Sequence, residues 1–181
     1  LILGLNNIKE EEILSKSKKL NTIINLKKEI ILVTGHRREN FGEGVKNICN
    51  ALIEISDELP NSIIVYPVHP NPNIQKPVND LLGNKENIFL INPLPYPEFI
   101  FLMNKSKIII SDSGGVQEEA PSLGKPVLLT RSNTERPEAL DSKTVMLVGT
   151  DKNKIKSTVL NLFKNEKLYK SISKLKNPYG D

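Results

Sequence analysis

The stretch KIIISDSGGVQEEA, residues 107–120, says more about the fold than any other part of this chain. It opens with an apolar run typical of a buried strand, passes through a Ser-Gly-Gly turn and enters a predicted helix at Gly115. Backbone N–H groups at such a helix start suit a phosphate group. Glu118 and Glu119, one turn further along, can accept hydrogen bonds from ribose hydroxyls. The stretch predicts a nucleotide or nucleotide-sugar site; the alternative is a tight strand–helix turn whose acids only offset the helix dipole.

On both sides of this stretch, apolar runs alternate with helical patterns. The predicted strands are residues 30–34, 62–66, 88–91, 107–111, 126–130 and 144–148. The predicted helices are residues 5–25, 44–58, 74–82, 97–104, 115–123, 152–164 and 166–176. Short Ile- and Val-rich strands that alternate with helices indicate βαβ units in a mainly parallel sheet. About six such units predict an open, doubly wound, Rossmann-like α/β domain, because a closed eight-fold barrel needs more chain.

Length and composition set the remaining bounds. The 181 residues suit one domain, and Cys49 is the single cysteine, so no internal disulfide forms and a reducing cytoplasm is expected. No apolar run reaches the ~18–20 residues of a membrane span, and no signal peptide is visible. The net charge of +4 comes from scattered lysines, which indicates solvated surfaces rather than a nucleic-acid interface. The chain starts without Met, and we interpret it as a piece of a longer polypeptide: residues 1–29 lead in from a preceding domain, and residues 30–181 form the binding domain.

Both histidines and all four arginines follow predicted strands, and therefore belong to loops on one rim of the sheet. Ligands of such sheets lie beyond the carboxyl ends of the strands, so this rim is the expected binding face. In the loop after residues 30–34, Arg37 and Arg38 can neutralise phosphate oxygens, and His36 can protonate a departing phosphate. The alternative for this loop is a solvent-exposed ion-pair cluster with Glu39.

Three further loops carry weaker signals. His69 lies in a rigid loop between two prolines, and two histidines without metal-ligand spacing do not predict a metal site. In the proline-rich segment 92–101, Phe99 can support a planar base, or it can simply fill the core. The charged run 134–139 can reach sugar hydroxyls or a pyrophosphate, or it can pair internally.

Six motifs in the same order closely resemble the non-hydrolysing UDP-N-acetylglucosamine 2-epimerases. They are VTGHRREN (33–40), YPVHPNPN (66–73), SDSGGVQEEAPSLGKPVLLTR (111–131), TERPEA (134–139), VGTD (148–151) and NPYGD (177–181). The resemblance runs from about residue 30 to residue 181 without a gap. It implies a glycosyltransferase-B arrangement of two Rossmann-like domains, of which this chain resembles the carboxyl-terminal, UDP-gripping one.

The resemblance also implies a reaction and roles for residues. Family members interconvert UDP-GlcNAc and UDP-ManNAc, precursors of cell-surface polysaccharides, by eliminating UDP and adding it back; they need no cofactor or metal. The positions that match the family's motifs fall into three groups. They are a catalytic residue near the pyrophosphate, His36; residues that bind UDP, Arg38, Phe99, Ser113, Gly114, Gly115 and Glu119; and residues that bind a second, allosteric UDP-GlcNAc, Arg37 and His69.

One departure limits what this chain can do alone. The family's principal acid–base carboxylates belong to the amino-terminal domain, so we expect the chain to bind UDP weakly and to epimerise nothing. Intact relatives are homodimers, and some act on other UDP-sugars. Two alternatives remain open: the donor domain of a glycosyltransferase, which shares the fold, and a non-catalytic nucleotide-sugar sensor. No nucleic-acid or membrane partner is expected.

Overall fold

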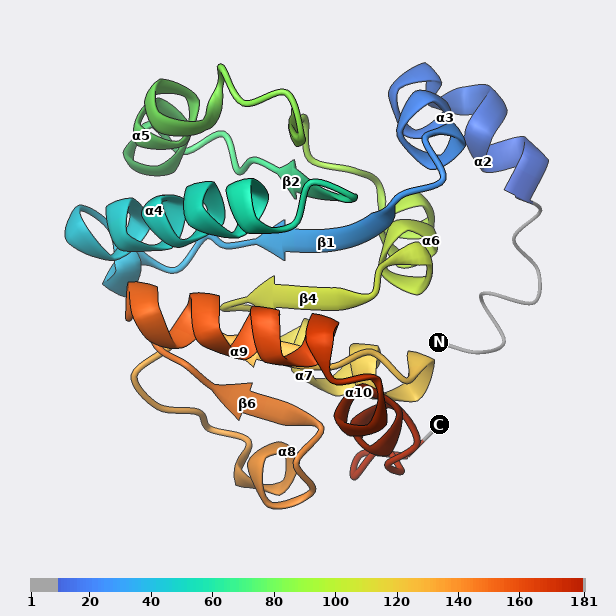
Figure 1. The fold of residues 1–181 in the computed structure, drawn as a ribbon, viewed down its shortest axis with the longest axis vertical. Coiled ribbons are helices and arrows are strands. Elements are labelled where there is room, and N and C mark those ends of the chain that lie inside the picture. The colour runs from blue at the N-terminus through green and yellow to red at the C-terminus, as the bar shows by residue number, and fades with distance from the viewer. Residues whose placement is uncertain (1–9, 181) are drawn as a thin grey trace.

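The computed structural model of the chain describes residues 10–180. Six strands form one sheet in the order β3-β2-β1-β4-β5-β6, and every neighbouring pair is parallel (Figure 1). The strands are β1 (Glu29–Thr34), β2 (Ser62–Pro67), β3 (Ile88–Ile91), β4 (Ile108–Ser111), β5 (Val127–Leu129) and β6 (Val145–Leu147). The predicted doubly wound α/β fold is confirmed, and all six predicted strands are present within about a residue of their expected ends.

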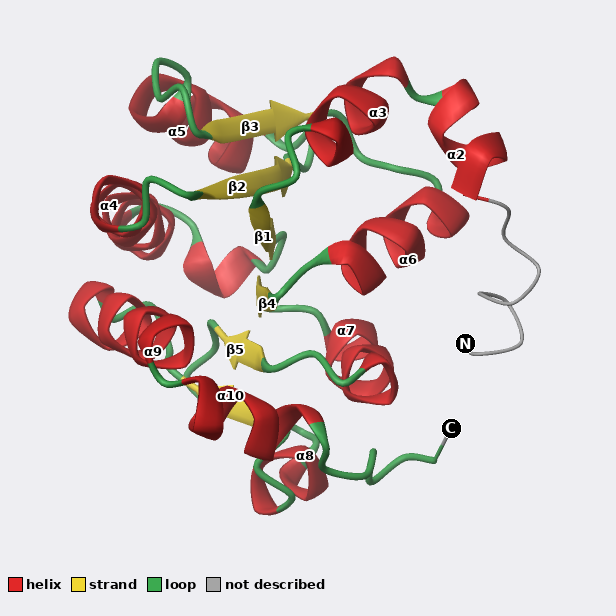
Figure 2. Ribbon diagram, turned by 45° about the vertical axis from the view of Figure 1, so that its right-hand side comes forward, coloured by secondary structure: helices red, strands yellow, loops and turns green. Residues whose placement is uncertain are grey.

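Helices cover both faces of the sheet, as Figure 2 shows. One face carries α4 (Glu43–Glu58), α5 (Pro72–Leu82), α9 (Lys152–Lys164) and α10 (Glu166–Ser173). The other face carries α2 (Glu10–Lys16), α3 (Lys18–Asn25), α6 (Tyr96–Lys105), α7 (Gly114–Glu119) and α8 (Pro137–Asp141). Two short 3-10 helices, η1 (Arg38–Asn40) and η2 (Ala120–Leu123), complete the described elements.

Alternation along the strands divides the core into two layers. In β1, Ile31 and Val33 pack under α4 and α9, whereas Ile30 and Leu32 pack under α3 and α6. Both sets are buried, which explains why the strands read as continuous apolar runs. Burial of each such side chain stabilises the fold by about 1.5–3 kcal/mol relative to an exposed position.

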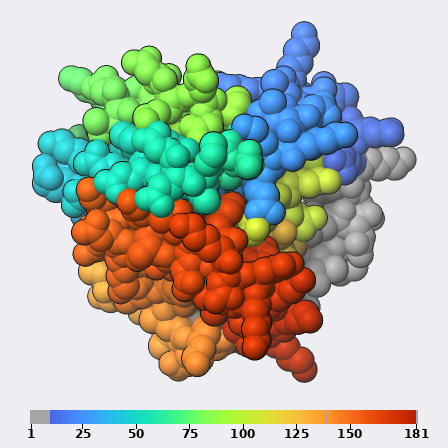
Figure 3. All heavy atoms as spheres, viewed as in Figure 1, coloured from blue at the N-terminus to red at the C-terminus, as the bar shows by residue number. Residues whose placement is uncertain are grey.

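Ion pairs join α4 and α9 across the surface of the first layer. The carboxylate of Glu54 accepts hydrogen bonds from Lys152 at 2.7 Å and from Lys156 at 2.9 Å, and Lys156 also pairs with Glu58 at 2.7 Å. Figure 3 shows the atoms of α4, in cyan, directly beside those of α9, in orange-red. These pairs connect α4 to α9, which lie far apart in the sequence.

Several predicted elements differ from the observed ones. The predicted helix 115–123 is divided, because α7 ends at Glu119 and η2 follows up to Gly124, whose φ of 65° stops it. The last predicted helix ends at Ser173 rather than at residue 176. Helix α8 was not predicted, since its five residues show no apolar periodicity; Pro137 at its first turn suits a helix start.

The amino-terminal segment forms two helices where one was predicted for residues 5–25. The break lies at Ser17, whose hydroxyl caps α3 by accepting the Leu20 N–H at 3.3 Å. Residues 5–9 of the predicted helix lie outside the described part of the chain. Ile13, Leu20 and Ile23 are buried in the second core layer. Across residues 10–180, we find no helix with the length and apolar character that a bilayer crossing requires.

Candidate functional site

The strand order places two loops side by side at the carboxyl edge of the sheet. β1 and β4 pair in register up to Thr34 and Ser111, so the chain leaves both strands at the same level. The connections from β1 and β4 lead to opposite faces of the sheet. At such a point, ligands of open α/β sheets bind in the crevice beyond the carboxyl ends of the strands. The predicted residues His36, Arg37 and Ser113 lie in these two loops.

Asp112, at the end of β4, ties the two loops together. Its side chain is only 1% exposed. Its Oδ2 accepts the backbone N–H groups of His36, at 3.0 Å, and Arg37, at 2.9 Å, and the Asn40 side-chain amide at 3.2 Å. The same Asn40 amide donates to the Thr130 carbonyl at 3.0 Å. A buried carboxylate with several donors fixes backbone geometry, so Asp112 holds the loop after β1 in place.

Asp112 was not among the predicted site residues. The available signal was an acidic residue directly after a buried strand, which is costly unless its carboxylate finds donors. Its donors come from residues more than 70 positions away, and the sequence does not indicate that pairing. The close approach also explains Gly35, where an added Cβ would lie 3.3 Å from Asp112 Oδ2.

The structure brings together the two histidines that the resemblance assigned to different roles. The exposed rings of His36 and His69 are stacked, with centroids 5.8 Å apart and planes inclined by 24°. His36 Nδ1 lies 3.5 Å from Asp112 Oδ1, and His69 Nδ1 accepts the Asn71 N–H at 3.2 Å. These contacts orient both rings at the mouth of the crevice.

A small cavity lies beneath the two loops. It is lined by Gly35, His36, Arg37, Tyr66 and Asp112 among others, and its volume of about 10 Å³ leaves room for one water molecule at most. Arg37 Nε is buried here without a hydrogen-bond partner among the described residues. Burial raises the pKa of the Cys49 thiol in the same lining to about 12, so this thiol is not a reactive nucleophile. Within residues 10–180, no group of three or more His, Cys, Asp or Glu side chains is arranged to hold a metal ion.

The Ser-Gly-Gly turn begins α7, as the sequence predicted, but an arginine from a distant loop covers it. An added Cβ at Gly114 would lie 2.7 Å from Arg136 Nη1 and 2.9 Å from Arg136 Cζ, so only glycine allows this approach. Arg136 Nε donates to Glu118 Oε1 at 2.5 Å. Thr134 Oγ1, from the same loop, donates to Gln117 Oε1 at 2.8 Å. The run 134–139 thus closes over α7, and Arg136 brings a guanidinium to the predicted phosphate position.

The predicted ribose residue, Glu119, has a partner that the sequence did not suggest. Tyr96, which is 59% exposed, donates its hydroxyl to Glu119 Oε1 at 2.7 Å. This hydrogen bond is the main cause that raises the pKa of Tyr96 to about 12. Phe99, one turn along α6 from Tyr96, is half-buried and packs against the second core layer. The hydrogen bond between Tyr96 and Glu119 therefore joins the start of α6 to the end of α7.

Of the four arginines of the rim, Arg131 and Arg136 form ion pairs. Arg38 is exposed in η1. Glu39 pairs with Arg131, whose Nε donates to Glu39 Oε1 at 3.0 Å. The Arg131 side chain is 4% exposed, and its Nη1 is buried without a hydrogen-bond partner among the described residues. This pair connects η1 to the loop after β5.

Comparisons with known proteins identify the family of this chain. The family model described as UDP-N-acetylglucosamine 2-epimerase matches residues 3–181. A UDP-N-acetylglucosamine 2-epimerase of Campylobacter jejuni is 59% identical over 158 residues, which make up 87% of this chain and 41% of that protein. The crystal structure of UDP-GlcNAc 2-epimerase from Neisseria meningitidis bound to UDP-GlcNAc has a TM-score of 0.93 and 44% identity, and the match covers 99% of this chain and 48% of that chain.

A more distant likeness concerns the fold alone. The C-terminal domain of a glycosyl transferase group 1 family protein from Francisella tularensis matches with a TM-score of 0.66 at 19% identity, over 83% of this chain and 82% of that chain. This chain spans 41–48% of the length of the curated relatives that it matches. Its sheet corresponds to one half of the glycosyltransferase-B type fold of those epimerases. The match of the family model over nearly all residues shows that the chain belongs to the UDP-N-acetylglucosamine 2-epimerase family.

Proposed function

We propose that this chain is the UDP-binding, carboxyl-terminal domain of a cytoplasmic, homodimeric enzyme that interconverts UDP-GlcNAc and UDP-ManNAc for cell-surface polysaccharides. One observation carries the proposal. Asp112 fixes the His36 loop next to the Ser-Gly-Gly turn, in a fold that matches a UDP-GlcNAc-bound relative with a TM-score of 0.93. In this proposal, residues 1–29 connect to the amino-terminal domain and residues 30–181 form the UDP site.

The diphosphate lies in the crevice between the loops after β1 and β4. In the turn formed by Ser113, Gly114 and Gly115, the backbone N–H groups of the two glycines are offered to its oxygens, since that of Ser113 already donates to Ser111 Oγ at 3.0 Å. Arg136 is placed to add charge-assisted hydrogen bonds. Arg38 lies exposed in η1 and supports the charge from the other side. The proposal needs a small rearrangement here, because Arg136 now covers Gly114.

The nucleoside lies over α6 and α7. Glu119 accepts the ribose hydroxyls, as a carboxylate in this position can. Phe99 supports the uracil ring with the part of its side chain that the core leaves exposed. Tyr96 holds the Glu119 carboxylate and has to release it, or share it, when the ribose binds.

The chemistry proceeds by loss and return of UDP. In the elimination, the C2 proton of the sugar is removed, the bond between C1 and the diphosphate oxygen breaks, and a 2-acetamidoglucal remains with UDP. Stabilising the leaving diphosphate falls to His36, which donates to it, while UDP stays bound to this domain. The proton then returns to the opposite face of C2 and UDP adds back to C1. The groups that move the C2 proton belong to the other domain.

The second pair of residues has a regulatory role in this proposal. Arg37 and His69 contact a second, activating UDP-GlcNAc. The stack of His69 on His36, at 5.8 Å, provides a physical link, because a ligand that moves one ring alters the surroundings of the other. In this proposal, the activating UDP-GlcNAc changes the rate of epimerisation by changing the position of the His36 ring.

Binding and turnover test the proposal separately. UDP added to the ¹⁵N-labelled chain is expected to shift the amide resonances of Gly114, Gly115 and Glu119 with weak affinity. The chain alone is expected to give no turnover of UDP-GlcNAc in a coupled assay. Unmoved resonances at all three positions would rule out the UDP site. Sustained turnover by the chain alone would contradict the proposal that the groups moving the C2 proton belong to the other domain.

The full-length protein distinguishes the proposed substrate from the alternatives. Incubation with UDP-GlcNAc is expected to produce the manno epimer, and His36→Asn is expected to reduce kcat more than it raises KM. Transfer of the sugar to an acceptor would instead indicate a glycosyltransferase, although the family match favours an epimerase. Epimerisation of a different UDP-sugar, such as a diacetamido-uronic acid, in preference to UDP-GlcNAc would correct the substrate.

A further inference from the structure

The motif NPYGD (177–181) is one that the proposed function leaves without a role. Residues 177–180, its described part, form a turn after α10, here called the Asn-Pro-Tyr-Gly turn. Inside this turn, the Gly180 N–H donates to the Asn177 carbonyl at 3.3 Å, and Asn177 Oδ1 accepts the Tyr179 N–H at 3.1 Å. Figure 2 shows the segment passing beside α8 and below α7. Asn177 is half-buried between exposed neighbours, so it is the residue of the turn that faces the protein.

The side-chain amide of Asn177 holds the end of α7. Its Nδ2 donates to the Glu118 carbonyl at 2.8 Å and to Ser122 Oγ at 2.5 Å, besides the Gly180 carbonyl at 2.9 Å. The last carbonyls of a helix lack partners within the helix, and Asn177 supplies one to Glu118. Because Ser122 belongs to η2, the same amide spans the point at which α7 gives way to η2.

Tyr179 extends the turn to a third element. Its hydroxyl lies 3.4 Å from Glu138 Oε2, in the first turn of α8. At this distance the hydrogen bond is weak, so its main effect is on position. Glu138 follows two residues after Arg136, which covers Gly114. The turn therefore contacts both α7 and the run 134–139.

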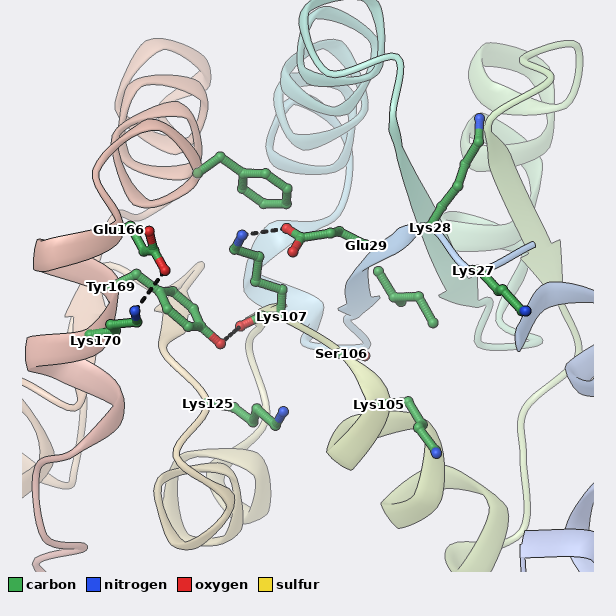
Figure 4. Close-up of a pocket in the computed structure, with 12 residues that line it drawn as sticks. Lys27, Lys28, Glu29, Lys105, Ser106, Lys107, Lys125, Glu166, Tyr169 and Lys170 are labelled. Atoms are coloured by element: carbon green, nitrogen blue, oxygen red, sulfur yellow. Dashed lines mark hydrogen bonds and ion pairs between the residues drawn. The ribbon is translucent and has the colours of Figure 1, made fainter. Parts of the chain in front are cut away.

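Helix α10, which leads into the turn, is itself fixed to the sheet. Figure 4 shows Tyr169 of α10 beside Lys107, in the cavity of about 700 Å³ where the strands begin. Tyr169 Oη donates to the Lys107 carbonyl at 3.1 Å, directly before β4. At the end of α10, the Ser173 carbonyl approaches Gly124 so closely that an added Cβ would lie 2.7 Å from its oxygen. These contacts bring Asn177 to α7 from a helix that is held at both ends.

A simple cap of α7 explains only part of this arrangement. Capping requires one donor for one free carbonyl. Here the same amide also binds Ser122, beyond the end of α7, and Tyr179 contacts α8. The elements that the turn holds together are those that carry Glu119 and Arg136, the ribose and phosphate ligands of the proposed UDP site.

We propose that the Asn-Pro-Tyr-Gly turn is a clasp that positions Glu119 and Arg136 for UDP, with Asn177 as its positioning residue. The inference rests on the proposed function. Glu118 is the link, because its carbonyl accepts from Asn177 and its carboxylate accepts from Arg136 Nε at 2.5 Å. Glu119 is the next residue along α7, so fixing the main chain at Glu118 fixes both ligand-facing side chains. Groups that are ordered before the ligand arrives bind it without the cost of ordering them.

Titration of the ¹⁵N-labelled chain with UDP, followed at the Gly115 amide, measures the effect of the clasp on affinity. Asn177→Asp keeps the Oδ1 acceptor and removes the donor, and it is expected to weaken UDP binding about tenfold, as misplacing one charged hydrogen-bond partner does. Asn165→Asp is the matched control, because Asn165 caps α10 by accepting the Leu168 N–H at 2.9 Å and aspartate caps equally well. Its affinity for UDP is expected to equal that of the wild type.

A double-mutant cycle separates positioning from general stabilisation of the fold. In an Arg136→Gln chain, Asn177→Asp is expected to weaken UDP binding only about threefold, because one of the two groups that it positions is gone. A tenfold effect in both backgrounds would show that Asn177 does not act through Arg136, and would overturn the clasp.

The same titrations distinguish failure of the clasp from failure of the UDP site. If UDP leaves Gly114, Gly115 and Glu119 unmoved in the wild type, the proposed function fails and the clasp fails with it. If UDP binds the wild type and Asn177→Asp equally well, the clasp alone is wrong. Should Asn177→Asp not fold, Ser122→Ala takes its place: it removes one neutral acceptor of the Asn177 amide and is expected to weaken UDP binding about twofold. An unchanged affinity of that folded variant would then refute the clasp.

Discussion

Replacement of Asp112 by asparagine tests how strongly one buried carboxylate organises the site. In the structure, Oδ2 of Asp112 accepts the backbone N–H groups of His36 and Arg37 at 3.0 and 2.9 Å and the Asn40 amide at 3.2 Å. Asparagine keeps the shape of the side chain but replaces a charged acceptor with a neutral one. It also turns an NH₂ group toward donors on at least one side.

The expected magnitude follows from these contacts. A hydrogen bond to a charged group contributes about 1.5–3 kcal/mol and a neutral one about 0.5–1.5 kcal/mol, so each of the two backbone bonds loses about 1 kcal/mol. With the opposed NH₂ group, we expect Asp112→Asn to lower the free energy of unfolding by about 2–3 kcal/mol. Because UDP binding depends on the position of the His36 loop, we also expect the affinity for UDP to fall.

Urea unfolding followed by circular dichroism measures the effect. With a slope of about 2 kcal/mol per molar, the midpoint for Asp112→Asn is expected about 1 M below that of the wild type. Asp151→Asn is the matched control: Asp151 caps α9 by accepting one N–H at 2.8 Å, and asparagine caps helices as well as aspartate does. Equal midpoints for both variants and the wild type would refute the reasoning, because they would show that the hydrogen bonds of Asp112 do not stabilise the loop after β1.

Three further predictions concern other parts of the chain. Gly124→Ala is expected to lower the free energy of unfolding by about 1–2 kcal/mol. The reasons are that φ at Gly124 is 65° and that an added Cβ would lie 2.7 Å from the last carbonyl oxygen of α10. Gly115→Ala is the control, because its Cβ would meet nothing within 3.8 Å, and it is expected to leave the urea midpoint unchanged or raise it. Two lysines of α9 lower the pKa of Glu54 from about 4.5 to about 2, so its stabilising effect is present above pH 4.5 and is lost as the pH falls toward 2. The melting temperatures of the wild type and Glu54→Gln are therefore expected to differ at pH 7 and to converge near pH 2. A difference that stays constant with pH would contradict this prediction. Tyr96→Phe frees the Glu119 carboxylate and is expected to tighten UDP binding about threefold in calorimetry, whereas weaker binding would show that Tyr96 contacts the ligand directly.

Much of the architecture was predictable because it depends on local patterns. Strands such as β1 and β4 are buried on both faces, so continuous Ile and Val runs mark them wherever they pair. Amphipathic stretches mark α4 and α9 in the same way. Because consecutive strands joined through helices are parallel, the loops that follow the strands all lie at one edge of the sheet. That is why the rim holding His36, His69 and the Ser-Gly-Gly turn could be anticipated.

Contacts between distant residues were not predictable from these patterns. Asp112 meets the His36 loop across more than 70 residues, and Arg136 reaches Gly114 from a run that lacks any periodic signal. Periodicity reports which side of an element is buried, and it carries no information on which distant element lies opposite. The strand order β3-β2-β1-β4-β5-β6 and the folding of the chain around it supply those neighbours, because a hydrogen bond or a charge contact depends on separation in space rather than along the chain.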